Sequence, residues 1–182
     1  MNNTLKIEGE TGVKIVGIDA SLTSTGIVVL NEGNVYTDTI QRKSTGVERL
    51  IEIRELVRLA VSGADLVAIE GYAFARSNQA YQLGELGGVL RVMFREEGIK
   101  YIDVAPSAVK KFATGKGNAN KEAVAVGVYK RWGKEFKTND EADAFVLAKI
   151  GQAYMAGQEG LTAFQREVID ALVGGKKGKR VG

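Results

Sequence analysis

The sequence predicts a single α/β domain with a mixed five-stranded sheet flanked by helices. Residues 13–40 contain three short apolar or alternating segments separated by tight turns, which is typical of antiparallel strands. After residue 44 the apolar positions change to helical spacing, and further short apolar runs alternate with helices. An antiparallel start followed by this alternation predicts the element order β-β-β-α-β-α-β-α.

The predicted first strand, residues 13–20, is mainly β-branched and suits the buried centre of a sheet. It ends near Asp19, and a carboxylate at the end of a buried strand costs free energy unless it is paired, hydrogen-bonded or bound to a metal. For one isolated aspartate, capping of the following turn is the simpler explanation. Residues 25–30 and 34–40 complete an antiparallel three-stranded unit.

A second acid is expected at the end of a neighbouring strand. Thr45 and Glu48 match a capping box, which predicts a helix from here to residue 61. Residues 65–70 form the next strand, which ends in Glu70. Because a strand-helix-strand order implies parallel neighbours with a right-handed crossover, Glu70 is expected near Asp19 at one edge of the sheet.

The later elements follow from apolar spacing and from glycine and proline positions. Gly84, Gly87 and Gly88 interrupt an expected helix; each glycine costs about 1 kcal/mol against alanine, which indicates close approach by another backbone. Pro106 suits a first helical turn. The predicted elements are a helix over 79–97, a strand over 100–104, a helix from 106, a glycine-rich loop over 114–120, and helices over 121–132, 140–156 and 161–173.

Composition limits the chemistry of this 182-residue chain. It has no cysteine and no histidine, which excludes disulfides, thiolate metal sites, histidine-ligated zinc and histidine-based triads. The length predicts one domain, which we expect over residues 1–173. Residues 174–182 contain four basic residues, which account for the positive sign of the net charge of +3, and we expect them to form a disordered basic tail. No segment matches a signal peptide or a membrane-spanning run, which predicts a soluble, cytoplasmic protein without membrane contact.

Two further acids and a basic region occur in the C-terminal half. Asp140 and Asp143 are three residues apart at the start of a helix and share one face, although acids in a first turn commonly serve only the helix dipole. Residues 109–137 contain eight basic residues against two acids. Such a region is either plain solvated charge or an anion-binding surface, and its occurrence with isolated acids requires explanation.

The element order, with acids after the first and fourth strands and at the start of a late helix, resembles the ribonuclease H-like fold and its two-metal carboxylate site. Two Mg²⁺ ions roughly 3.5–4 Å apart need several hard oxygen ligands, and together they activate water and stabilise the leaving oxygen of a phosphodiester. This chemistry requires no histidine.

Within that superfamily the sequence resembles the RuvC-type Holliday junction resolvases. Six matching segments occur in family order between residues 17 and 145. They are GIDASLTSTG at 17–26, AIE at 68–70, LGELGGVL at 83–90, APSAVK at 105–110, GKGNANK at 115–121 and DEADAF at 140–145. Each segment alone is weakly specific, whereas six in order form a specific pattern.

The resemblance implies an endonuclease that resolves four-way or other branched DNA by paired nicks and acts as a homodimer. It implies Asp19, Glu70, Asp140 and Asp143 as ligands of two Mg²⁺ ions, with Mn²⁺ as a substitute, Lys121 as a further catalytic residue, and no nucleotide cofactor. The DNA contacts expected with it are Lys110, Lys111, Lys116, Lys121, Tyr72, Phe74 and Arg76. The expected dimer interface is Leu83, Gly84, Leu86, Gly87, Gly88 and Leu90.

The sequence departs from the family pattern in three places. Asp140 stands where some relatives carry histidine, which removes imidazole acid-base chemistry. The first loop reads Asp-Ala-Ser from Asp19 rather than Asp-Pro-Gly, and both Tyr72 and Phe74 are candidates for the aromatic that enters the junction. With the short chain and basic tail, these departures resemble a phage-encoded branch acting in a bacterial or phage-infected cell, and they leave the cleavage-sequence preference open.

Three other interpretations were weighed against the resolvase. The segment from Gly17 to Gly26 also resembles the first phosphate-binding hairpin of actin-like kinases and ATPases, but those proteins need two domains and a second glycine-rich phosphate loop. A ribonuclease H-like nuclease acting on another branched DNA, on repair substrates or on RNA/DNA hybrids stays open. A non-catalytic junction-binding protein is expected to lack at least one of the four acids.

Overall fold

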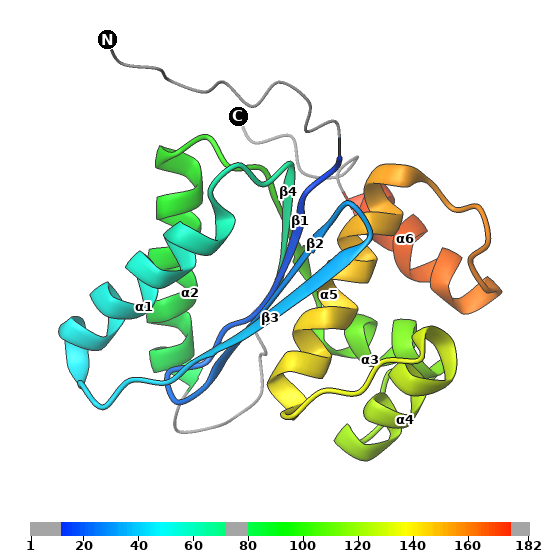
Figure 1. Cartoon of the computed structure of the whole chain (residues 1–182), viewed down its shortest axis with the longest axis horizontal. Coiled ribbons are helices and arrows are strands. Elements are labelled where there is room, and N and C mark those ends of the chain that lie inside the picture. Colours follow the sequence, from blue (N-terminus) through cyan, green and yellow to red (C-terminus); the bar gives the residue numbers. More distant parts are fainter. Residues whose placement is uncertain (1–11, 72–79, 176–182) are drawn as a thin grey trace, which may run out of the picture.

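The computed structural model describes residues 12–71 and 80–175, with side chains described for 12–71 and 84–174. A twisted sheet lies between two helical layers (Figure 1). The strands are β1 (Ile15–Asp19), β2 (Thr25–Asn31), β3 (Asn34–Ile40), β4 (Leu66–Glu70) and β5 (Tyr101–Val104). The helices are α1 (Gly46–Val61), α2 (Ala80–Glu96), α3 (Pro106–Thr114), α4 (Lys121–Trp132), α5 (Asn139–Ala156) and α6 (Ala163–Gly175).

The five strands form one mixed sheet in the order β3-β2-β1-β4-β5, which confirms the predicted fold class. The central strand β1 pairs antiparallel with β2, where Ile15 lies opposite Leu30, and parallel with β4, where Ile18 lies opposite Ile69. β4 pairs parallel with β5. The carboxyl ends of β1, β4 and β5 therefore lie at the same end of the sheet, which is where ligands bind in open α/β sheets.

Each face of the sheet is covered by its own layer of helices. α1 and α2 bury one face, in a core that includes Val16, Ile53 and Phe94. α5 lies across the other face, with α3, α4 and α6 packed around it (Figure 1). Every residue of α5 from Ala144 to Ile150 except Lys149 is buried, so this helix is fixed in place by packing against β1 and β2.

Some element boundaries differ from the sequence-based expectation. Thr45 is the N-cap of α1 by backbone geometry, but its side chain makes no capping hydrogen bond, so the predicted capping box is not formed. The last helix begins at Ala163 rather than at Leu161 and ends at Gly175, inside the segment expected as a tail. Residues 176–182 lie outside the described residues.

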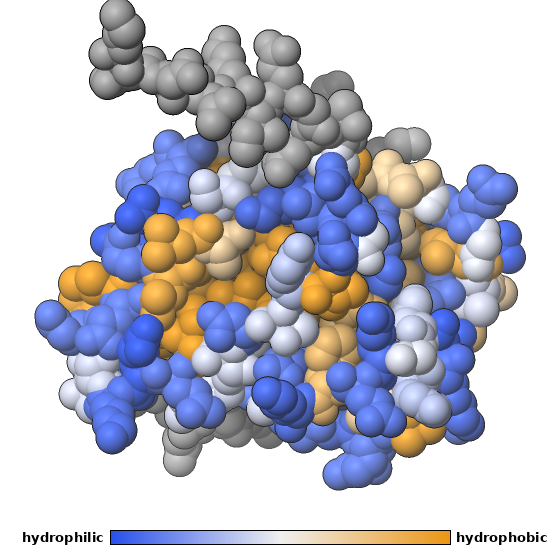
Figure 2. Space-filling model, in the orientation of Figure 1, coloured by the Kyte–Doolittle hydropathy of each residue, from blue (hydrophilic) through white to orange (hydrophobic). Residues whose placement is uncertain are grey.

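The surface combines charged regions with an apolar area over α1. Figure 2 shows apolar atoms gathered over this helix, which carries the exposed side chains Val47, Ile51 and Leu59. Within residues 12–71 and 80–175, no helix is both long and apolar enough to cross a membrane.

Candidate active site

Two candidate acids lie side by side at the carboxyl end of the sheet. Asp19 and Glu70 each follow directly after the paired residues Ile18 and Ile69 of the parallel strands β1 and β4. The Asp19 and Glu70 carboxyls share a hydrogen bond. The sequence-based expectation that Glu70 emerges next to Asp19 is therefore confirmed, and the reason is the parallel register of the two central strands.

The turn that follows Asp19 is fixed by Thr25, which is fully buried at the start of β2. The Thr25 hydroxyl donates a hydrogen bond to the Ser21 carbonyl oxygen at 2.5 Å and accepts one from the Ser21 backbone N–H at 3.1 Å. The turn is thus closed without the Asp19 carboxylate, so turn capping does not explain this residue.

The other two candidate acids are brought to the same place by the start of α5. Glycine at two strand positions allows this helix to approach the sheet closely. A Cβ on Gly26 would lie 2.3 Å from the Asp140 carbonyl oxygen, and a Cβ on Gly17 would lie 2.0 Å from the Ala144 carbonyl oxygen, distances that no real side chain tolerates. These glycines explain why Asp140, and with it Asp143 on the next turn, lies close to Asp19, because Gly17 is on the same strand as Asp19 and Gly26 lies opposite Asp19 on β2.

The four carboxyls interact electrostatically as one group. Burial, followed by the negative charges of Glu70, Asp143 and Asp140, raises the pKa of the Asp19 carboxyl to about 8. Burial and the charge of Asp143 also raise the pKa of Glu70, and burial and the charge of Asp140 raise the pKa of Asp143. Without a cation, the site therefore holds more negative charge than its surroundings stabilise.

Two predicted lysines lie close enough to counter part of this charge. Lys110 is on α3 and Lys121 is the first residue of α4. The positive charges of both side chains lower the pKa of the Glu70 and Asp143 carboxyls, against the rise that burial causes. The structure thus brings Lys110 and Lys121 to the acids as expected, and the Asn120 side chain fixes the start of α4 by accepting a hydrogen bond from the Ala123 backbone N–H at 2.9 Å.

The chemistry of this donor set fits hard divalent cations. All four candidate ligands are carboxylates, which Mg²⁺ prefers, and burial together with neighbouring negative charge raises the pKa of Asp19, Glu70 and Asp143, a charge that a cation would neutralise. As they stand, the described residues contain no group of three or more acids arranged to hold a metal ion, so cation binding would require the carboxyls to adjust. The carboxylates that would hold a cation are Asp19, Glu70, Asp140 and Asp143.

Arg91 supports the site and was missed by the sequence analysis. Its guanidinium donates hydrogen bonds to the Glu70 carbonyl oxygen at 3.1 Å, to the Gly87 carbonyl oxygen at 2.8 Å and to Asp103 Oδ1 at 2.8 Å. Arg91 thereby ties α2 to the ends of β4 and β5. No local pattern predicts the contacts with Glu70 and Asp103, because these two residues lie on other elements of the fold.

Glu141, between Asp140 and Asp143, was also missed. It is only 8% exposed, its backbone N–H donates to Thr138 Oγ1 at 3.1 Å, and its side chain accepts a hydrogen bond from the Lys137 backbone N–H at 3.0 Å. This arrangement resembles a capping box, and the Thr138-x-x-Glu141 spacing could have predicted it. It differs from a capping box in one respect, because the Glu141 side chain bonds the N–H of Lys137, the residue before the N-cap, rather than that of the N-cap Thr138.

The remaining predicted DNA contacts are placed differently from Lys110 and Lys121. Lys111 Nζ lies 2.5 Å from Glu167 Oε2 of α6, so this lysine is held in an ion pair within the fold. Lys116 is exposed on the loop before α4, and its backbone N–H donates to Thr114 Oγ1 at 3.0 Å. Tyr72, Phe74 and Arg76 lie outside the described residues.

The expected dimer interface on α2 divides into an inner and an outer part. Leu86 and Leu90 are fully buried in the core of their own chain, so assigning them to an interface is corrected: their positions face the sheet. Gly87 is also buried. A Cβ on Gly84 or Gly88 would meet no atom of the described residues within 4 Å, so these glycines do not serve packing against the chain's own sheet. The side chain of Leu83 is outside the described set.

Comparison with known proteins gives consistent matches. A family model described as "Crossover junction endodeoxyribonuclease RuvC" matches residues 15–150. The protein of that description from Mycobacterium avium is 33% identical over 175 residues, covering 85% of this chain and 93% of the relative. The Thermus thermophilus RuvC structure superposes with a TM-score of 0.65 and 26% identity, covering 79% of this chain and 96% of that chain. T. thermophilus RuvC in complex with Holliday junction substrate superposes with a TM-score of 0.63 and 26% identity, covering 75% and 90%.

Proposed function

Because the chain belongs to the RuvC family of crossover junction endodeoxyribonucleases, we propose that it resolves four-way DNA junctions by hydrolysing one phosphodiester bond in each of two strands. The observation that supports this function best is the convergence of carboxyls from β1, β4 and α5 with Lys110 and Lys121 at one end of the sheet. The group contains no histidine, so proton transfer and charge stabilisation depend on carboxylates, lysines and bound cations.

We infer that Asp19, Glu70, Asp140 and Asp143 hold two Mg²⁺ ions, with Mn²⁺ as a substitute. Bound there, the ions would supply an activated water and stabilisation of the leaving oxygen. The acids come from two strands and one helix that are buried and packed together. This packing holds the carboxylates in position, so that binding a cation would cost little conformational entropy. Glu70 and Asp19 must give up their shared proton for both carboxylates to bind a cation.

Lys110 and Lys121 would contact the phosphate that is cut, or the phosphates beside it. Their charges already act on Glu70 and Asp143, so both side chains lie within range of a phosphate bound at these acids. A lysine in that position stabilises negative charge that grows in the transition state and also contributes to affinity. Lys116, on the neighbouring loop, is positioned for affinity alone.

We propose that the active form is a homodimer. A four-way junction with paired arms has two-fold symmetry, and one compact site reaches only one strand, so paired nicks need two sites related by a two-fold axis. The outer face of α2 supports this, since Gly84 and Gly88 are four residues apart, a Cβ on either would meet no atom of the described residues within 4 Å, and Val92, one turn further, is 57% exposed. Small residues on that face allow a second helix to approach closely.

Cleavage of synthetic substrates tests the function directly. A four-way junction, a linear duplex of the same sequence and an RNA/DNA hybrid are incubated with the protein, with Mg²⁺, with Mn²⁺ or with a chelator. We expect symmetric nicks near the branch point of the junction only, and only with a divalent ion. Equal cutting of duplex or hybrid would contradict the resolvase and favour another nuclease of this fold, and ATP turnover without cutting would favour an actin-like enzyme.

Substitution of the acids tests the site. Asp19→Asn, Glu70→Gln, Asp140→Asn and Asp143→Asn each remove one anionic ligand and should each abolish cleavage, whereas junction affinity should persist because it depends mostly on lysine and arginine contacts with phosphate. If one of these variants cut at a normal rate, the substituted residue would not belong to the site. A heterodimer with one Asp143→Asn subunit should nick only one of the two symmetric strands.

A further inference from the structure

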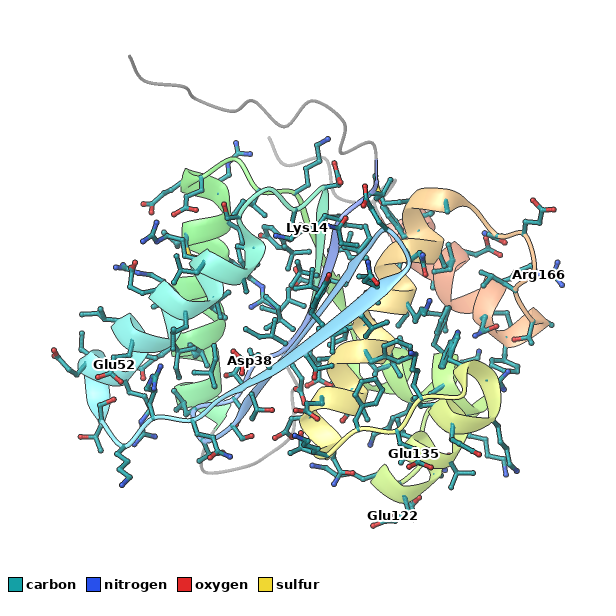
Figure 3. All side chains as sticks on the ribbon, in the orientation of Figure 1. Lys14, Asp38, Glu52, Glu122, Glu135 and Arg166 are labelled. Atoms are coloured by element: carbon teal, nitrogen blue, oxygen red, sulfur yellow. The ribbon has the colours of Figure 1, made fainter. Side chains whose placement is uncertain are left out.

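A groove extends from the candidate active site along α4. It has a volume of about 790 Å³ and lies between α4 and residues 134–140. Lys121 and Asp140 line it, so the groove is continuous with the group of acids. The label of Glu135 in Figure 3 shows where to find the loop that lines the groove, between α4 and the start of α5. We call this feature the α4 groove.

The walls of the α4 groove are held by contacts within the chain. α4 ends at Gly133, which adopts φ 62° and donates its N–H to the Tyr129 carbonyl oxygen at 2.8 Å. On the loop, the Phe136 ring packs against Phe145 with centroids 5.0 Å apart, and the Lys137 backbone N–H is bonded to Glu141. A groove with both walls anchored in this way is formed before a ligand arrives.

The lining combines apolar surface with positive charge. Val128 and Ala142 are buried at the base, while Tyr129 is 56% and Val126 52% exposed along one wall. The charged side chains of the lining are Lys121, Lys130, Lys134 and Lys137 against Glu135 and Asp140. An exposed tyrosine beside several lysines suits a ligand that has both a flat apolar part and anionic groups.

We propose that the α4 groove holds an unpaired nucleotide of the cleaved strand, next to the phosphate bound at the acids. Its base stacks on Tyr129, and the phosphates on either side contact Lys130, Lys134 and Lys137. Stacking on an aromatic side chain is tolerant of sequence, since every base has an apolar face, and it requires that the base has left its pair. This inference rests on the proposed function and adds to it a reason why the enzyme would act where strands exchange partners.

A nucleic acid fits the groove better than an acidic peptide does. The groove opens directly onto Lys121, which the proposed function assigns to the DNA phosphate, and onto Asp140, which it assigns to the metal ions, so a peptide seated there would exclude DNA from the acids. The volume is within the range of about 300–1,000 Å³ that is typical of pockets for compact ligands and is enough for one nucleotide.

Photochemical crosslinking tests the contact. Four-way junctions carrying 5-iodouracil at successive positions around the branch point are bound to the Asp143→Asn protein and irradiated, and the crosslinked peptide is identified by mass spectrometry. We expect a crosslink to Tyr129 from a nucleotide adjacent to the cleavage position mapped with the wild-type protein. A crosslink confined to nucleotides of the uncut strands, or none at Tyr129 from any position, would overturn the proposal.

Kinetics give a second, independent test with a matched control. Tyr129→Ala should raise KM for the junction about tenfold, in line with the loss of one base–aromatic stack, and leave kcat within about twofold. Tyr129→Phe should retain the wild-type KM because it keeps the ring. The control is Tyr36→Ala on β3, where a tyrosine of similar exposure, 59%, lies outside the groove. An unchanged KM for Tyr129→Ala would contradict the proposal.

The lysines of the groove are tested through salt dependence. Lys134→Ala should reduce the slope of log affinity against log salt by about one, as for one lost phosphate contact, whereas Lys100→Ala, at the opposite end of the sheet, should not change it. Failure of the groove assignment can be distinguished from failure of the proposed nuclease function. If the wild-type protein cuts junctions and the groove variants behave as wild type, the groove assignment fails and the resolvase stands; absence of cutting by the wild type would instead contradict the proposed function.

Discussion

Thr39 donates a hydrogen bond from its hydroxyl to Glu141 Oε1 at 3.1 Å, and this contact joins the edge strand β3 to the helix that carries two of the candidate acids. The other carboxylate oxygen of Glu141 accepts from the Lys137 backbone N–H at 3.0 Å. Glu141 thus connects β3, the loop that forms one wall of the α4 groove, and the first turn of α5. It does not face the acids itself, so we regard it as a positioning residue.

Removing the Glu141 carboxylate should loosen the start of α5. Glu141→Ala leaves the Thr39 hydroxyl and the Lys137 N–H without this partner, and we expect a loss of about 1–3 kcal/mol in the free energy of unfolding. Because Asp140 and Asp143 flank Glu141, single-turnover cleavage should slow about tenfold, which corresponds to about 1.4 kcal/mol, at unchanged junction affinity. Chemical denaturation and rapid-quench assays measure the two effects.

Glu48→Ala on α1 is the control for Glu141. Glu48 has the same spacing from an N-cap threonine, but Thr45 makes no side-chain capping bond, so this variant should change stability by less than about 0.5 kcal/mol. Recovery of the cleavage rate in Glu141→Gln, which can still accept a hydrogen bond, would support positioning. A normal rate in Glu141→Ala would refute it.

The stability of the metal-free protein should fall as the pH rises from 5 to 8. The pKa of Asp19 is about 8 in the folded protein against its ordinary value of 3.8, so between these pH values the folded state binds more protons than the unfolded state, and stability is lost with rising pH. The raised pKa values of Glu70 and Asp143 act in the same direction. A fully uncompensated shift at Asp19 corresponds to a loss on the order of 5 kcal/mol. Thermal denaturation in a chelator measures it.

Two further measurements distinguish the contribution of the site from the pH dependence of the rest of the protein. Mg²⁺ at millimolar concentration should raise the denaturation temperature more at pH 8 than at pH 5, since a cation neutralises the same charge. Asp19→Asn should be more stable than the wild-type protein at pH 8 in the absence of metal, although it does not cut DNA. A wild-type stability that is flat over this pH range would contradict the electrostatic description of the site.

Lys121→Ala should slow cleavage of bound junction and not only weaken binding. Loss of a cation beside the developing charge is expected to lower the single-turnover rate at saturating enzyme about 10- to 100-fold. Lys100→Ala, on an exposed lysine before β5, serves as the control for a change of overall charge. If Lys121→Ala reached the wild-type rate once saturated, Lys121 would have a role in affinity alone.

Gly84→Ile should yield a folded monomer that binds junctions and fails to make paired nicks. A Cβ at Gly84 would meet no atom of the described residues within 4 Å, so we expect a larger side chain there to leave the fold intact and to block a second helix. Analytical ultracentrifugation reports the oligomeric state and circular dichroism reports the fold. The contrasting variant is Gly26→Ala, whose Cβ would lie 2.3 Å from the Asp140 carbonyl oxygen and should damage the fold itself. A dimeric Gly84→Ile protein would place the interface elsewhere.

Local sequence patterns were enough to predict the element order, the mixed sheet and the proximity of Asp19 and Glu70, whereas Asp140 and Asp143 were grouped with them only through the family resemblance. The first three predictions depend on local chemistry: β-branched runs predict the buried strands, apolar spacing predicts the helices, and Asp19 and Glu70 directly follow paired residues of the parallel strands β1 and β4. Once β1 and β4 are parallel neighbours, the two acids must meet. That step needs only the handedness and connection rules of α/β folds.

The side chains that support the site became apparent only from the packed structure. The contacts of Arg91 with Glu70 and of Thr39 with Glu141 join residues 21 and 102 positions apart, and no local pattern encodes such pairs. Two further results also depend on contacts between distant elements. Lys111 forms an ion pair with Glu167, and Leu86, predicted at the dimer interface, is buried in the core of its own chain. A residue type and its spacing specify which face of an element a side chain occupies, whereas its partner is set by the packing of elements that are distant in sequence.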